Sequence, residues 1–294
     1  MTRSVAMTII DVLFGVFAAP FLGRALLVLC ALSVAAGVIG VLTSLRGLEF
    51  MSDGLSHAVF PGLALGLAVG GMAGVLPGAV IAALVAAVVL TILNLSRTPS
   101  DSSIAIVLTA TFSVGVIIVS RGGGALQLGH LEGLLFGRIL TIAPSDVAPL
   151  IVVTTTATAA ILITLKQQIF RAADPLGSRA IGFSALGTDL TLTVAIALVV
   201  VAAAATIGSL LVLAFLLVPG AAARLITSRL WLLFPTAVGF ALLASWLGLA
   251  AGAEASMNGW DIPAGATVAL VFVSGYLLTV LGSVLVRCRR TGRA

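Results

Sequence analysis

The sequence predicts an all-α fold, a polytopic bundle of about eight to nine membrane-spanning helices in a single domain over residues 1–294. Two observations lead to this fold class. Hydrophobic residues make up 61% of the chain and charged residues only 9%, whereas a soluble domain carries roughly 25% charged residues. The mean hydropathy is +1.28. So few charges could not cover a globular surface, so most of the surface is expected to face lipid.

Individual segments support this fold. A spanning helix needs about 20 predominantly apolar residues, and several segments approach this length. Two candidates, Leu190–Ala205 and Ser209–Ala223, are separated only by Thr206–Gly208, so they are either two short spans or one span with a re-entrant helix. The candidates are Leu22–Leu45, Gly54–Gly70, Gly74–Leu95, Ser102–Val119, Pro144–Leu165, Leu190–Ala205, Ser209–Ala223, Trp231–Ala251 and Ala264–Val286.

The N-terminal residues 1–21 are predicted to form an interfacial segment. An apolar stretch at Ser4–Ala19 is interrupted by Asp11 and lacks a clean small-residue cleavage site, so we do not expect a secretory signal peptide here. The stretch is expected to lie at the membrane surface or to span part of the membrane.

The basic residues indicate the orientation. Most of the 15 arginines and lysines follow the odd-numbered spans or belong to a basic tail at 287–294. Because basic residues concentrate in cytoplasmic loops, the C-terminus is expected in the cytoplasm of a multi-pass cell-membrane protein. The net charge of +5 therefore has a topological explanation, and no nucleic-acid partner is expected.

An aspartate and a histidine stand out at the start of the second span. Asp53 and His57 are four residues apart, so both side chains lie on one face of a helix. Carboxylate oxygen and imidazole nitrogen can together bind a divalent transition metal. Alternatively, Asp53 caps a helix that starts at Gly54 and His57 bonds to a neighbour. Pro61 and Gly62 are expected to interrupt the helix one turn later, which suits a site lined by protein or water.

The longest predicted cytoplasmic loop, 166–189, is amphipathic. Asp174 and Pro175 are expected to cap and open a short helix, which Gly182 and Gly187 can end. Such a helix is a natural docking element for a soluble partner. Asp189 is interpreted as a cap of the sixth span.

Other features exclude or weaken alternative functions. His130 and Glu132 lie in a predicted outer loop and are interpreted as a solvated turn, a surface for an external partner, or a metal site. The only lysine, Lys166, is followed by glutamine, so the chain has no Walker A motif with which to hydrolyse ATP. No nucleophile motif of a hydrolase is present either, and we do not expect an enzyme.

The motifs around these residues resemble the permease subunits of the manganese, zinc and iron ABC importer family. The resemblance rests first on Leu45-Arg-Gly-Leu48 followed by Asp53-Gly-Leu-Ser-His-Ala-Val-Phe-Pro-Gly62, where Phe60 replaces the usual leucine. Further similarity lies in Leu135-Phe-Gly-Arg-Ile-Leu140, where Arg138 replaces an asparagine. It continues in the Asp174–Gly182 segment and in Gly208–Arg224.

The resemblance implies a type II ABC importer-like fold and a transport subunit with no permanently bound cofactor. The cargo would be a divalent metal, Zn, Mn or Fe, and Asp53 and His57 would bind it in passage. Ser56, Pro61 and Gly62 would shape the pathway. The ATPase contact would be made by the 166–189 segment, at Asp174, Pro175, Ala180, Ile181 and Gly182.

The implied partners are a second copy of the chain, cytoplasmic ATP-binding subunits and an external metal-binding protein. Two alternatives stay open: a permease for a metal chelate or cobalamin, and a metal channel or exporter that works without an ATPase.

Overall fold

The computed structural model describes residues 20–95, 100–121, 137, 139–208, 211–259 and 263–291. Most of the predicted interfacial segment therefore lies outside the described residues. The same is true of three residues of the predicted outer loop, His130, Glu132 and Arg138. The roles suggested for these residues stay predictions.

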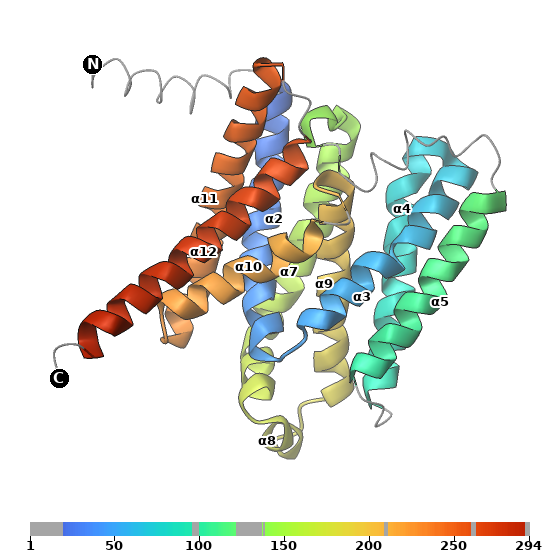
Figure 1. Ribbon diagram of the computed structural model, residues 1–294. Coiled ribbons are helices and arrows are strands. Elements are labelled where there is room, and N and C mark those ends of the chain that lie inside the picture. Colours follow the sequence, from blue (N-terminus) through green and yellow to red (C-terminus); the bar gives the residue numbers. More distant parts are fainter. Residues whose placement is uncertain are drawn as a thin grey trace, which may run out of the picture.

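The described residues form a helical bundle (Figure 1). Seven of the described helices are long and apolar enough to cross a membrane, and Ser102–Ile118 and Val212–Ile226 are shorter apolar helices. Each of the predicted spans coincides with one of them, so the all-α membrane fold is confirmed. The elements are α2 (Pro20–Leu45), α3 (Glu49–Ala58), α4 (Phe60–Leu95), α5 (Ser100–Arg121), η4 (Ile139–Thr141, a 3₁₀ helix), α7 (Pro144–Ala173), α8 (Pro175–Ala180), α9 (Ala185–Thr206), α10 (Val212–Ile226), α11 (Leu230–Met257) and α12 (Ala264–Thr291).

Helix α2 lies at the centre of the bundle. It contacts α7, α9, α10 and α11, and 72% of its most apolar window is buried. Small residues permit this close packing, as is usual between membrane helices. At Gly40, an added Cβ would meet the backbone carbonyl of Leu216 in α10. Between α2 and α11, the Oγ atoms of Ser33 and Ser245 lie 2.8 Å apart and share a buried hydrogen bond.

Helix α4 is a hairpin of two spans. Gly71, with φ +59° and ψ −150°, breaks the helical conformation between them, and this agrees with the predicted boundary between Gly70 and Gly74. Glycines line the contact of the two halves: Gly62 and Gly66 of the first half face Gly78 and Gly74 of the second. Only glycine permits the backbones to approach this closely.

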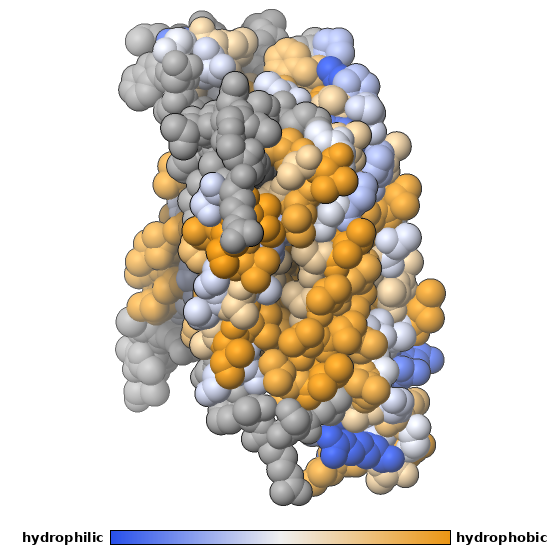
Figure 2. Space-filling view, turned by 90° about the vertical axis from the view of Figure 1, so that its right-hand side faces the viewer, coloured by the Kyte–Doolittle hydropathy of each residue, from blue (hydrophilic) through white to orange (hydrophobic). Residues whose placement is uncertain are grey.

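The surface of the bundle is apolar between its two ends. Figure 2 shows one face on which hydrophobic residues cover most of the coloured area, whereas hydrophilic residues gather towards the ends. Large apolar side chains are strongly exposed on the bundle, for example Ile81 at 64% and Ile163 at 84%. An exposed apolar belt of this kind is expected to face lipid, because its contact with water would cost free energy.

The spans alternate in direction, so the C-terminal ends of α2, α4, α7, α10 and α12 lie towards the end of the bundle that carries α8 (Figure 1). We call this the α8 end. The segments predicted to share one side of the membrane therefore do lie on one side.

Two predicted boundaries differ from the structure. The segment predicted as a loop at 166–189 is mostly helical, because α7 continues to Ala173 and α9 begins at Ala185. Nothing interrupts α7 before Asp174, whose helical conformation is disfavoured by the proline that follows. The predicted tail at 287–294 likewise continues α12 as far as Thr291.

Candidate metal-pathway site

Helix α3 starts at a turn that requires glycine. Gly47 has φ +64°, a conformation that costs a residue with a Cβ atom roughly 1–2 kcal/mol. The N–H of Leu48 donates to the carbonyl of Thr43 at 3.0 Å, which is the closing bond of a Schellman motif. This turn ends α2 and directs α3 away from it, with one face of α3 packed inward and the other open.

Asp53 and His57 lie one turn apart on the open face of α3. The Oδ1 atom of Asp53 is 3.8 Å from the Nε2 atom of His57, and the side chains are 41% and 39% exposed. The opposite face, with Met51 and Leu55, is buried. Because α3 begins at Glu49, Asp53 lies inside the helix. The alternative interpretation of Asp53 as an N-cap is therefore wrong.

In the part of the chain that the structure describes, few metal-ligating side chains lie near Asp53 and His57. Among the described residues there is no group of three or more His, Cys, Asp or Glu side chains that could bind one ion. Transition metals in proteins usually take four or more ligands. The oxygen and nitrogen of the Asp53–His57 pair could supply two of these ligands, and any further ligands would have to come from other groups.

The three residues predicted to shape the pathway have distinct structural roles. The Oγ atom of Ser56 donates to the carbonyl of Asp53 at 2.8 Å, and Ser56 is 4% exposed. Val59 separates α3 from α4 but keeps helical backbone angles (φ −71°, ψ −28°), so the expected interruption of the helix is slight. Pro61 occupies the first turn of α4, where its missing N–H costs little. Gly62 packs against Gly78. The suggested influence of these residues on a pathway stays a prediction.

Helix α8 protrudes at its end of the bundle (Figure 1). The Oδ1 atom of Asp174 accepts the N–H groups of Leu176 at 3.1 Å and Gly177 at 2.9 Å. Pro175 opens the helix and Gly182, with φ +93°, follows its end. This predicted helix is confirmed. Gly187, by contrast, lies within α9, because Ser184 caps α9.

The protruding helix presents apolar side chains at the α8 end. Leu176 is 76% exposed and Ile181 is 66% exposed, and Ala180 and Gly182 are exposed beside them. The ring of Phe183 packs edge-on against Phe170 at the end of α7, with 6.2 Å between the centroids. The segment is therefore anchored on one side and offers an apolar surface on the other.

A partly buried ion-pair network lies close to α8, and no sequence pattern indicated it. Asp189 was interpreted as a cap, but Ser184 occupies that position. The carboxylate of Asp189 instead binds the guanidinium groups of Arg46 and Arg171. Asp189 and Arg46 are separated by 143 residues, so no local pattern could have indicated that they meet.

An apolar bundle with an ionisable pair on an open helix face and a protruding helix at one end has the architecture of a membrane permease. Comparisons with known proteins define the family. Residues 18–283 match the model of the ABC 3 transport family.

Three relatives extend this match. The manganese transport system membrane protein MntC of Listeria innocua is 32% identical over 229 residues, which are 78% of this chain and 80% of that protein. MntC of Halalkalibacterium halodurans is 30% identical and matches 93% of this chain and 92% of its own length. A chain in the structure of PsaBC from Streptococcus pneumoniae in complex with Fab superposes with a TM-score of 0.76 at 30% identity, covering 92% of this chain and 95% of that one.

The chain belongs to the ABC 3 transport family. It is a multi-pass membrane permease subunit of an ABC transporter, as the motifs around Asp53 and His57 predicted.

Proposed function

We propose that this chain forms the membrane pathway of an ATP-driven importer for Mn²⁺. The observation that carries the proposal is the Asp53–His57 pair on the open face of α3. A carboxylate within a membrane span is expensive, and such residues usually line an ion route. The metal is taken from the relatives, which are named as manganese transport proteins. The oxygen and nitrogen ligands suit Mn²⁺ and also Fe²⁺ or Zn²⁺.

A second copy of the chain would complete the route. In a single chain, the side chains of Asp53 and His57 are 41% and 39% exposed on an apolar bundle. A two-fold axis beside α3 would bring two such pairs together and remove them from lipid. The four ligands would then bind a cation weakly enough to release it onwards.

The energy and the metal capture would come from partners. The chain has no Walker A motif, so a separate cytoplasmic subunit would hydrolyse ATP. That subunit would dock on the exposed apolar side chains of α8, Leu176 and Ile181. The α8 end, where the basic residues concentrate, would face the cytoplasm. An external metal-binding protein would deliver the ion at the opposite end.

The metal content of cells that lack this chain tests the proposal. We expect cellular manganese to fall in the deletion strain and to recover when the gene is restored, with growth rescued by added Mn²⁺. If only cellular iron or only cellular zinc falls, that metal is the cargo in place of manganese. Loss of a metal chelate or cobalamin would favour the chelate permease, and uptake that persists without any partner ATPase would favour the channel or exporter.

The cap of α8 provides a graded test of docking. Asp174→Ala removes the acceptor of two N–H groups, and a lost N-cap costs about 0.5–2 kcal/mol. We expect α8 to fray and metal-dependent ATP hydrolysis by the assembled transporter to fall by a few-fold. Asp174→Asn is the matched control, because asparagine caps as well as aspartate does and should retain the wild-type rate. Equal rates in both variants would contradict the docking role.

A further inference from the structure

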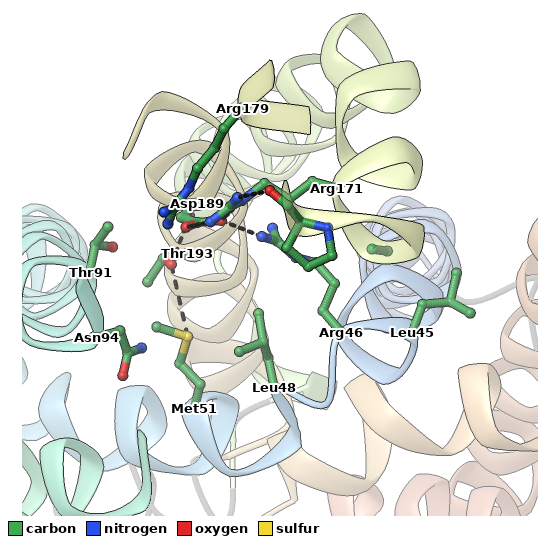
Figure 3. Close-up of a pocket in the computed structure, with 12 residues that line it drawn as sticks. Leu45, Arg46, Leu48, Met51, Thr91, Asn94, Arg171, Arg179, Asp189 and Thr193 are labelled. Carbon is green, nitrogen blue, oxygen red and sulfur yellow. Dashed lines mark hydrogen bonds and ion pairs between the residues drawn. The ribbon is translucent and has the colours of Figure 1, made fainter. Parts of the chain in front are cut away.

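The network around Asp189 joins three segments at the α8 end (Figure 3). The Oδ1 and Oδ2 atoms of Asp189, in α9, accept hydrogen bonds from Nε and Nη2 of Arg171 at 2.8 and 2.6 Å. The Oδ1 atom also accepts a hydrogen bond from Nη2 of Arg46. Arg46 in turn donates through Nη1 to Gln168 of α7 at 3.0 Å. The aspartate therefore holds the end of α2 and the end of α7 together.

This network is well shielded. The side chains of Arg171, Arg46 and Asp189 are 8%, 10% and 22% exposed. Shielded ion pairs contribute little net stability compared with apolar side chains of the same shape. A two-pronged arginine–carboxylate contact does, however, fix the relative position of the segments that carry it. The network is thus better suited to positioning than to stabilisation.

Each arginine lies next to a functional segment. Arg171 precedes α8, and its Nη1 atom donates to the carbonyl of Pro175, the first residue of α8, at 3.4 Å. Arg46 stands at the end of α2, two residues before Leu48, and the turn that follows it sets the direction of α3. Asp189 is consequently the shared partner of a residue that contacts α8 and a residue that immediately precedes the turn before α3.

Space for rearrangement adjoins the network. Arg46, Arg171 and Asp189 line a cavity of about 450 Å³, whose opposite wall includes Thr91 and Asn94 of α4. Arg179, which belongs to α8 itself, lines the same cavity and points towards Asp189 in Figure 3. A displacement of α8 would therefore change which arginines face the carboxylate, and a discrete change of partners is a way to transmit motion between packed helices.

We propose that Asp189 is a positioning residue that couples the movement of α8 to α3. When the partner ATPase moves α8, the Arg171–Asp189–Arg46 network transmits the displacement to the turn before α3, and the Asp53–His57 pair is reoriented. The inference rests on the proposed function, because it takes α8 as the docking helix and α3 as the metal route. It predicts that a broken network uncouples ATP hydrolysis from metal transport and does not simply abolish both.

The test uses the complete transporter in liposomes, with this chain, its ATP-binding subunits and the external metal-binding protein. Uptake of Mn²⁺, Fe²⁺ and Zn²⁺ and ATP hydrolysis are measured in the same vesicles. For Asp189→Asn we expect the number of ATP molecules hydrolysed per metal ion transported to rise about tenfold, within the range of coupling between sites. A purely structural role would lower uptake and hydrolysis together and leave this ratio unchanged.

A second variant covers the case in which Asp189→Asn does not assemble. Arg171→Lys keeps the positive charge beside Asp189 but cannot form the two-pronged bond and the contact with Pro175 together. The expected result is again a raised ratio. Asp146→Asn and Arg229→Lys are the matched controls, because both positions are exposed, and they should keep the wild-type ratio.

The outcomes separate the two proposals. If the wild-type transporter moves none of the three metals, the proposed function fails and the coupling role falls with it. If the wild type transports metal and Arg171→Lys and every assembled Asp189 variant keep the wild-type ratio, only the coupling role is overturned.

Discussion

Asp53→Asn is expected to reduce metal uptake by more than about 100-fold while leaving the amount of protein in the membrane unchanged. Even a partner that only orients a metal ligand is worth 10–100-fold, and this substitution removes a ligand charge from each copy of the chain. The side chain is 41% exposed in the single chain, so its replacement should not disturb the buried face of α3. His57→Ala should have a similar effect.

The measurement is uptake of radioactive Mn²⁺ into cells, normalised to the amount of this chain in their membranes. A matched control is available in Glu254→Gln. Glu254 accepts a hydrogen bond from Asn258 at 3.3 Å. These two residues are four positions apart, as Asp53 and His57 are, but they lie at the end of α11 and not on α3. The control should transport normally. Wild-type uptake by Asp53→Asn would remove the basis for a pathway along α3.

Gly78→Leu is expected to prevent the two halves of α4 from closing. A Cβ atom at this position would lie 2.8 Å from the Cα and 3.0 Å from the backbone nitrogen of Gly66, and would overlap the carbonyl of Gly62. Overpacking with a flexible neighbour already costs 1–3 kcal/mol. Here the obstructing atoms are backbone, so no rotamer change relieves the clash, and we expect a cost above about 3 kcal/mol.

The effect can be followed as the amount of folded protein after extraction in detergent, and as the temperature at which that protein aggregates. Gly239→Leu in α11 is the control, because an added Cβ there meets no atom within 4 Å. The control should accumulate to wild-type levels. A stable Gly78→Leu protein with normal uptake would show that the α4 hairpin does not need this close contact.

Local patterns were sufficient to predict most of the fold. The spans follow from apolar length, and the break of α4 at Gly71 lies between two predicted spans because a glycine pair offers the conformation that a tight turn requires. The cap at Asp174 and the first helical position of Pro175 were predictable for the same reason. Each of these features depends on residues within a few positions of one another in the chain.

Boundaries were predicted less well where no local signal opposed the helix. Lys166–Ala173 was predicted to belong to a loop because the apolar stretch of the fifth span ends at Leu165, yet it continues α7. An amphipathic stretch is compatible with both a solvated loop and the last turns of a helix, and here the helix had no breaker before Pro175. The presence of α8 was predicted correctly. The loop segments that connect it to α7 and α9 are shorter than predicted.

By itself, the sequence determined the membrane class, the spans, the pairing of Asp53 with His57 on one helix face and the family. These depend on composition and on short spacings, which the helical period converts directly into geometry. The tertiary structure alone decided which face of α3 is open, and that Asp189 binds two arginines instead of capping a helix. Both outcomes depend on contacts between segments far apart in the chain, and such contacts exist only once the helices have packed.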